Sequence, residues 1–543
     1  MSNTLIALLR RLGGGKLRSL AGETIIAAIE KVEPADVEKQ VARILLLKYG
    51  EAILNQREIR LSVIDVLDKN ASFALCRLIG ERANTHLQAT TVLRRYFRTY
   101  GEKKSQQLVD FLGLDPRFYY KTIPDDRSAS ELISITPGEQ IRLKNYLHGY
   151  QKTIKDDIIE LLQQRGKRFL VQMPTGSGKT FTALEAVIDI LRRRRRKKYV
   201  VWVVDSNELA EQALASFSYL WKLKGDRDIN SFRLFKSFTP EFDDAEGGVV
   251  FASFSQIYSI LENTDHPAYK AVWRLIKNSE LLIVDEAHTS VAPSYELCIR
   301  AFLNNDYTGV AGLSATPGRS NPTSTEQLVE LYSDNLVRLH NDSGPIKDPI
   351  GYLQHHSFLA KLDSRIMETG VTVATNNEEA LLTTLASNPE RNDRILDQLK
   401  LANDFKESTL VFACTLDHVI ALSILCKASG IKAEYIIGEV DQVRRLEILS
   451  MFKKREFFIL LNLDILSTGV DLPNVNKIII TRPIGSTILY SQILGRALRG
   501  PKNGGNKTNT IITLKDNLLN FPSANFIYNM FAIDWKPKTL VER

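Results

Sequence analysis

The stretch "VQMPTGSGKTFTALEAV", residues 171–187, decides the fold class of this chain. Its apolar start predicts a strand, its two glycines predict a tight turn, and the amphipathic run after them predicts a helix. Backbone N–H groups around such a turn bind phosphate, together with the positive end of the helix dipole. The usual pattern G-x-x-x-x-G-K-[ST] has glycine where this chain has Met173, but the rest is intact. We therefore expect a phosphate-binding loop made of Thr175, Gly176, Ser177, Gly178, Lys179 and Thr180.

The stretch "LLIVDEAH", residues 281–288, places two adjacent carboxylates at the end of a predicted strand. Because an unpaired buried charge is costly, Asp285 and Glu286 need a partner, and Mg²⁺ provides one. We expect Asp285 and Thr180 to hold Mg²⁺ and Glu286 to deprotonate the attacking water. Lys179 would then contact the β- and γ-phosphates of ATP. The alternative is an acidic surface pair, which the phosphate loop in the same predicted lobe makes less attractive.

A third motif, "QILGRALRG" at residues 492–500, carries two arginines on one face of a predicted helix. An arginine brought to the γ-phosphate stabilises the charge that develops in the transition state. We therefore expect Arg496 and Arg499 to act on ATP that lies between two lobes. The alternative, a basic helix surface, stays open for two arginines taken in isolation.

The chain divides into regions of different character. Residues 1–123 carry apolar residues at helical spacing, and residues 123–140 are polar with Pro and Gly, which predicts a linker. From about residue 141, short apolar runs alternate with helical stretches, which is typical of parallel sheets with crossover helices. The predicted fold class is α/β, with a helical accessory region at 1–135, one lobe at 136–340, a second lobe at 341–520 and a tail at 521–543.

Composition narrows the class of protein. The net charge is +8, and residues 1–135 account for +5 of it, with 21 Lys and Arg against 16 Asp and Glu. This excess permits an anionic partner such as nucleic acid. None of the four cysteines has C-x-x-C spacing, so we expect neither a zinc ribbon nor disulfides, and a reduced, cytoplasmic setting. No apolar run approaches the ~18 residues that span a membrane, and we recognise no signal peptide.

Together these motifs, in this order and spacing, resemble the superfamily 2 helicases, specifically the DEAH-box group. The resemblance covers about residues 140–515 and implies two RecA-like lobes with ATP between them. In layout the chain is most similar to the motor subunits of type I and type III restriction systems and to RadD-like bacterial helicases. Residues 1–135 resemble no family that we recognise.

The resemblance also implies roles for side chains outside the phosphate loop. In "LHGYQ", residues 147–151, Gln151 would contact adenine, although many relatives have arginine where this chain has His148. In "STGVDLP", residues 467–473, Asp471 would approach the ribose, and Gln492 opens the Q-x-x-G-R-x-x-R motif. The residues implied to touch the nucleic-acid backbone are Ser206, Asn207, Ser253, Thr415 and Thr468. Those implied to couple hydrolysis to movement are His288, Ser314 and Thr316.

The sequence therefore predicts an ATP-dependent helicase or translocase that uses ATP and Mg²⁺. DNA is preferred over RNA by analogy with similar proteins, and we expect a role in repair or in defence against foreign DNA. Two alternatives stay open: a duplex DNA translocase or remodeller that leaves strands paired, and a nucleic-acid-binding module that uses ATP only as a switch. No nuclease motif is recognised, so cutting would need a partner such as a nuclease, for which the helical region is the expected docking point.

The helical region itself has two interpretations. Its basic excess fits a grip on nucleic acid or on a partner, and equally fits a scaffold with solvated charges. The stretch "VLRRYFRTY", residues 92–100, presents the same choice. Its arginines and aromatic rings suit stacking on single strands, or they form an amphipathic helix with Val92, Tyr96 and Tyr100 inside.

Overall fold

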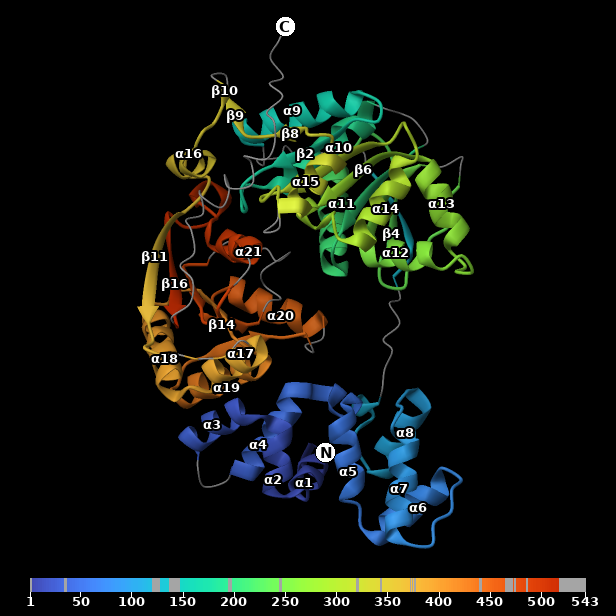
Figure 1. Cartoon of the computed structure of the whole chain (residues 1–543), viewed down its shortest axis with the longest axis vertical. Helices are drawn as coiled ribbons and strands as arrows, with labels where there is room; N and C mark the ends of the chain where they lie inside the picture. The colour runs from blue at the N-terminus through green and yellow to red at the C-terminus, as the bar shows by residue number, and fades with distance from the viewer. Residues whose placement is uncertain are drawn as a thin grey trace.

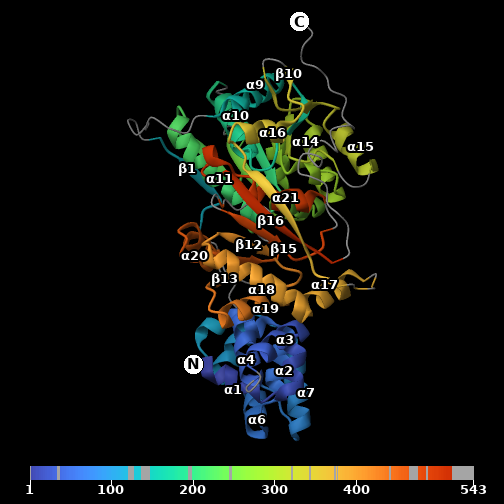
Figure 2. The same ribbon diagram turned by 90° about the vertical axis from the view of Figure 1, so that its left-hand side faces the viewer.

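The computed structural model shows three stacked parts: a helical region, then lobe 2, then lobe 1 (Figure 1). The same order is visible after a quarter turn (Figure 2). The residues that the structure describes are 2–33, 37–119, 127–135, 147–193, 198–243, 247–318, 322–341, 344–371, 373, 375, 377–438, 442–463, 472, 475–484 and 487–516.

The helical region holds only helices among its described residues, as its apolar spacing predicts. They are α1 Ser2–Arg10, α2 Gly13–Ala21, α3 Glu23–Val32, α4 Val37–Tyr49, η2 Gly50–Asn55, α5 Arg57–Asp65, α6 Lys69–Leu78, α7 His86–Tyr96, α8 Glu102–Phe111 and η3 Pro116–Phe118. In α7 the aromatic rings are used for packing. Phe97 is fully buried, and Tyr96 donates a hydrogen bond to Gln107 Oε1 at 2.9 Å. The stretch is therefore amphipathic, but its buried side chains are Leu93 and Phe97, while Val92, Tyr96 and Tyr100 are half-buried. Arg94, Arg95 and Arg98 are exposed, so contact with single strands stays a prediction.

Lobe 1 is built on an eight-stranded sheet of order β1-β4-β5-β3-β6-β7-β2-β8. Its strands are β1 Ser130–Ile133, β2 Arg168–Gln172, β3 Tyr199–Val204, β4 Ile229–Leu234, β5 Gly248–Ser253, β6 Ser279–Asp285, β7 Gly309–Ser314 and β8 Leu336–Val337. Its helices are α9 Gly149–Gln163, α10 Lys179–Arg193, α11 Asn207–Lys224, α12 Phe254–Glu262, α13 Tyr269–Lys277, η4 Ala287–Thr289, α14 Pro293–Leu303 and α15 Pro322–Leu331. All strand pairs are parallel except β1 with β4.

The central strands of lobe 1 are buried on both faces, so each reads as an unbroken apolar run. Along β3, Trp202 points into a core shared with α9, α10 and α11, whereas its neighbours Val201 and Val203 point into a core with α12, α13, α14 and α15. This alternation follows from the two-residue period of a strand. Because the strands run parallel, the loops that follow them lie together at one edge of the sheet.

Lobe 2 has a six-stranded parallel sheet of order β11-β16-β15-β12-β14-β13. The chain passes from lobe 1 to lobe 2 through β9 His340–Asn341, β10 Gly344–Pro345 and α16 Pro349–His355. The strands of lobe 2 are β11 Lys361–Glu368, β12 Thr409–Phe412, β13 Ala433–Ile436, β14 Ile459–Asn462, β15 Lys477–Ile480 and β16 Thr508–Lys515. Its helices are α17 Glu378–Ser387, α18 Pro389–Asp404, α19 Leu416–Ala428, α20 Gln442–Lys453, α21 Thr487–Ala497 and η5 Pro501–Asn503. The predicted α/β fold with two RecA-like lobes and a helical N-terminal region is confirmed.

The structure differs from the predicted organisation at one boundary. The stretch predicted as a linker, residues 123–140, contains β1, which pairs antiparallel with β4 at the edge of the lobe 1 sheet. Three of the four β1 residues are exposed, because an edge strand is only half covered. Such a strand carries no apolar run, and its sequence therefore reads as a loop.

The helical region does not stand apart from the motor lobes, because it packs on α19 of lobe 2. Ile420 of α19 belongs to the apolar core of the helical region, and Ile424 is partly buried against it. Thr24 Oγ1 lies 2.7 Å from Ser387 Oγ, and the Tyr435 hydroxyl donates to the Leu47 carbonyl at 3.3 Å. Lobe 2 and the helical region thus share an apolar contact, which fixes the helical region on lobe 2.

A buried ion pair joins several strand ends of lobe 2. The guanidinium of Arg391 has no exposed surface, and it donates from Nε to Asp516 Oδ1 at 3.0 Å and from Nη2 to Asp516 Oδ2 at 2.7 Å. It also donates to the Thr481 carbonyl, and Thr369 Oγ1 donates to Asp516 Oδ1 at 2.5 Å. Arg391 thereby connects the start of α18 with the ends of β11, β15 and β16.

Replacing Arg391 by Met should destabilise lobe 2 by about 3–5 kcal/mol, because Asp516 would stay buried without its counter-charge. Urea unfolding measures this loss. Arg391→Met/Asp516→Leu should recover much of the stability, since a buried ion pair replaced by apolar side chains is often neutral. Arg394→Met, which alters an exposed arginine of the same helix, is the matched control and should change stability by less than about 0.5 kcal/mol. Equal losses in Arg391→Met and Arg394→Met would contradict the role of the buried pair.

Candidate active site

The phosphate loop lies between β2 and α10, as its sequence predicts. Gly176 and Gly178 have φ angles of +80° and +86°, a region that residues with a Cβ rarely adopt. A Cβ at Gly178 would also lie 2.4 Å from Gln151 Nε2. Met173, at the position usually held by glycine, is fully buried in the core, and its N–H donates to the Ser314 carbonyl at 3.1 Å. This departure from the pattern therefore leaves the turn itself unchanged.

The predicted catalytic side chains meet beside this loop. Lys179 Nζ lies 3.0 Å from Glu286 Oε1, and Thr180 Oγ1 donates to Asp285 Oδ2 at 2.8 Å. Asp285 ends β6, and α10 begins at Lys179, so two neighbouring segments at one sheet edge supply all four groups. A cation, a hydroxyl and two carboxylates are thus assembled at the N-terminus of α10, where anions are favoured.

The two carboxylates differ in their electrostatics. Burial raises the pKa of Asp285, and the neighbouring Glu286 charge adds to this effect, while Lys179 opposes it. For Glu286, burial acts to raise the pKa, but the charges of Lys179, His288 and Arg496 outweigh it, so its pKa lies below the usual value. Glu286 also has φ 52° and ψ 48°, a left-handed conformation that is strained for a residue with a Cβ. The lowered pKa keeps Glu286 ionised, which a proton acceptor requires, and the strained backbone marks its position as a candidate functional one.

The three predicted coupling residues form one contact chain. His288 Nδ1 lies 3.4 Å from Glu286 Oε2 and 3.3 Å from Ser314 Oγ. Ser314 Oγ donates to the Thr316 carbonyl at 2.9 Å and accepts from the Thr316 N–H at 3.1 Å. The loop after β7 is therefore connected through His288 to the carboxylate beside the phosphate loop.

Helix α21 of lobe 2 packs directly on the phosphate loop of lobe 1. A Cβ added at Gly495 would lie only 1.9 Å from Thr175 Cγ2, so this contact requires glycine. The Arg496 charge acts on Glu286, which places this guanidinium within electrostatic range of the site. Gln492 lies half-buried on the same helix, and the backbone of Arg499 forms an antiparallel bridge with Leu359. The structure thus brings the motif of lobe 2 to the motif of lobe 1.

The segment predicted to recognise adenine forms hydrogen bonds with the phosphate loop. Gln151 Nε2 donates to the Ser177 carbonyl at 3.0 Å, and the Tyr150 hydroxyl donates to the same oxygen at 2.8 Å. His148 Nε2 lies 2.9 Å from Asn503 Oδ1 of lobe 2, and its ring is 4.4 Å from that of Phe358. Sequence reasoning missed Asn503 and Phe358, because a contact between distant segments leaves no local pattern.

Three of the residues predicted to contact nucleic acid are helix N-caps. Ser206 accepts a hydrogen bond from the Leu209 N–H, Ser253 from Gln256 and Thr415 from His418, at 3.1–3.4 Å. Ser206 follows β3 and Ser253 ends the adjacent strand β5, whereas Thr415 follows β12 in lobe 2. Ser253 is 1% exposed, so its helix start would have to contribute through backbone N–H groups.

The structure says less about the other residues predicted to contact nucleic acid or the ribose. The side-chain Oδ1 of Asn207 accepts a hydrogen bond from the Lys236 N–H at 3.1 Å, so this side chain holds the loop after β4. Thr468 and Asp471 lie outside the described residues.

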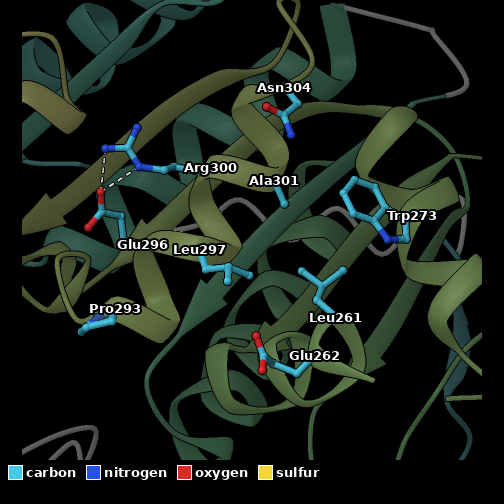
Figure 3. Close-up of a pocket in the computed structure, with 9 residues that line it drawn as sticks. All are labelled: Leu261, Glu262, Trp273, Pro293, Glu296, Leu297, Arg300, Ala301 and Asn304. Carbon is cyan, nitrogen blue, oxygen red and sulfur yellow. Dashed lines mark hydrogen bonds and ion pairs between the residues drawn. The ribbon is translucent and has the colours of Figure 1, made fainter. Parts of the chain in front are cut away.

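A cavity of about 560 Å³ lies on lobe 1 apart from these sites (Figure 3). It is bounded by α12, α13 and α14, with Trp273 on one side and the Glu296–Arg300 ion pair on the other. None of its lining residues belongs to the predicted ATP site or nucleic-acid face. Among the described residues no group of three or more His, Cys, Asp or Glu has the arrangement of a metal site. Of the helices in the described ranges, none is long and apolar enough to cross a membrane.

A known protein family matches the sequence of each lobe. The family described as "Type III restriction enzyme, res subunit" matches residues 144–319, and "Helicase conserved C-terminal domain" matches residues 390–501. Together the two matches span just over half of the chain. The matched ranges contain the phosphate loop, both carboxylates and the paired arginines.

Individual relatives are distant. "Putative ATP-dependent helicase IRC3" of Saccharomyces cerevisiae is 27% identical over 65% of this chain and 49% of its own length. "Type I restriction enzyme EcoKI endonuclease subunit" of Escherichia coli is 24% identical over 73% of this chain and 36% of its own length. The chain thus spans about half or less of each of these relatives. Among solved structures, a fragment of a putative HsdR subunit from Vibrio vulnificus YJ016 has a TM-score of 0.46 at 18% identity, covering 68% of this chain and 64% of that one.

Proposed function

We propose that this chain, which belongs to the superfamily 2 helicases, hydrolyses ATP in order to move along DNA and separate its strands. One observation carries this proposal: the motif of α21 in lobe 2 packs on the phosphate loop of lobe 1 through Gly495 and Thr175. A nucleotide held by one lobe and sensed by the other links hydrolysis to relative movement of the lobes.

The residues at the phosphate loop suit ATP with Mg²⁺. Thr180 and Asp285 supply oxygen ligands of the kind that Mg²⁺ prefers, and Lys179 supplies a cation for the β- and γ-phosphates. Bound Mg²⁺ would neutralise charge that develops on the phosphates. Glu286 would accept the proton of the attacking water, and Arg496 or Arg499 would stabilise the γ-phosphoryl group.

Nucleic acid would lie across the helix starts at Ser206, Ser253 and Thr415. Backbone N–H groups at these positions, with the half-buried hydroxyls of Ser206 and Thr415, suit phosphates rather than base edges, so binding should depend on salt more than on sequence. The matches to restriction-enzyme subunits favour DNA over RNA. The setting that we propose is repair or defence against foreign DNA, with a nuclease as the protein partner.

The test is the rate of ATP hydrolysis with single-stranded DNA, duplex DNA, forked DNA and RNA, measured side by side with strand displacement on the fork. We expect DNA to stimulate hydrolysis more than RNA and the fork to be opened. Stimulation by duplex without displacement would favour a translocase or remodeller instead. Binding of DNA without sustained turnover would favour the ATP-switched module, and stimulation by RNA alone would overturn the choice of DNA.

A further inference from the structure

An ion pair between the helical region and lobe 2 lies next to the predicted phosphate contact at Thr415. Lys48, near the end of α4, donates from Nζ to Asp417 Oδ1 at 2.5 Å. Asp417 is two residues beyond Thr415, the N-cap of α19. Lys48 is 7% exposed, so its ammonium group is almost entirely enclosed by protein.

The helical region also closely approaches the carboxylate that pairs with Lys48. The backbone of Gly22 approaches the other oxygen of the same carboxylate, and a Cβ there would lie 2.7 Å from Asp417 Oδ2. Gly22 also has φ +86°, so glycine is required for its conformation as well. Burial lowers the pKa of Lys48, but the hydrogen bond and the charge of Asp417 outweigh burial, so the pKa is raised and the side chain stays cationic.

An aspartate in this place has two opposing effects. In the first turn of α19 its charge stabilises the helix through the dipole. The same charge repels a phosphate that approaches Thr415 and the first N–H groups of the helix. Thr415 and Asp417 are both half-exposed, so solvent screens this repulsion only in part. A cation paired with Asp417 removes the conflict.

We propose that Lys48 is a positioning residue that neutralises Asp417 and so allows the start of α19 to bind a nucleic-acid phosphate. The inference rests on the proposed function, in particular on the nucleic-acid contact at Thr415. It gives the helical region a defined task, which is to complete the nucleic-acid site of lobe 2 without contacting the strand through Lys48.

The test compares nucleic-acid affinity in full-length variants, with a fluorescent oligo(dT) as the probe in an anisotropy titration. Lys48→Met should weaken binding about five- to tenfold at low salt, because Asp417 is left uncompensated, and the difference should shrink as salt is raised. Lys48→Met/Asp417→Asn should bind nearly as well as the wild type. Both variants lack the ion pair, so a loss of docking alone would affect them equally.

Lys31→Met is the matched control, because Lys31 forms an exposed ion pair at the same interface with Asp393 of α18 and not with Asp417. It should bind the probe like the wild type. Equal affinities for Lys48→Met and Lys48→Met/Asp417→Asn, or an equal loss in Lys31→Met, would overturn the proposal while leaving the proposed function intact. A wild-type protein that binds no nucleic acid would overturn both.

Discussion

A Glu286→Gln protein should bind ATP and hydrolyse it at least about 100-fold more slowly than the wild type, since a general base typically contributes 10²–10⁴ to the rate. Gln keeps the size of the side chain and tolerates the same left-handed backbone, so the loop around it should keep its shape. Lys179 loses its charged partner at 3.0 Å but remains available for phosphate. Steady-state hydrolysis with saturating DNA and binding of a fluorescent ATP analogue separate the two effects.

The matched control for this change is Glu262→Gln, an exposed carboxylate of lobe 1 that borders the cavity in Figure 3. It should hydrolyse ATP at the wild-type rate. If Glu286→Gln fails to bind nucleotide although it is folded, Glu286 has a structural role in the loop. A normal rate would remove Glu286 from the reaction altogether.

Arg496→Ala should bind ATP normally and lose about 10³-fold in turnover, as expected when an arginine that acts on the γ-phosphate is removed. The phosphate loop belongs to lobe 1 and stays intact, so the defect should appear in kcat rather than in nucleotide affinity. Arg496→Lys should recover little, because an ammonium group lacks the planar fork of donors. Single-turnover hydrolysis measures the chemical step directly.

Arg365→Ala, on the exposed strand β11 of the same lobe, is the matched control and should leave turnover unchanged. Arg499→Ala tests the second arginine of the motif, whose backbone pairs with Leu359. Unchanged rates in both Arg496→Ala and Arg499→Ala would place the arginines outside the site. That result would also undermine a reaction centre shared by the two lobes.

Much of lobe 1 could be predicted from local patterns. Buried parallel strands such as β3 and β6 are continuous apolar runs, and each catalytic motif follows a strand within a few residues. Because parallel strands end at one edge of the sheet, the residues that follow them can be expected to lie close together once the strands are recognised. The meeting of Lys179 with Glu286 and of Thr180 with Asp285 was predictable for this reason.

Edge strands and contacts between regions could not be predicted in this way. β1 and β11 are largely exposed, so neither has the apolar run by which a strand is recognised. Gly495 is one glycine among thirty in the sequence, and only the structure shows Thr175 against it. The pairs His148–Asn503 and Lys48–Asp417 join residues more than 350 positions apart, and no spacing rule reports such a contact.

Helix α19 shows which features the local sequence determines and which only the tertiary structure decides. Its sequence, "LDHVIALSILCKA", is apolar on nearly every side, and such a helix must be covered on two faces. Val419 and Leu422 pack on the lobe 2 sheet, while Ile420 and Ile424 enter the core of the helical region. Local sequence determined the buried central strands, the phosphate loop and the need to cover α19, because these depend on short-range periodicity and backbone conformation. Tertiary structure alone decided that the helical region covers it, mainly through α3, because the hydrophobic effect rewards burial of apolar surface without specifying the partner.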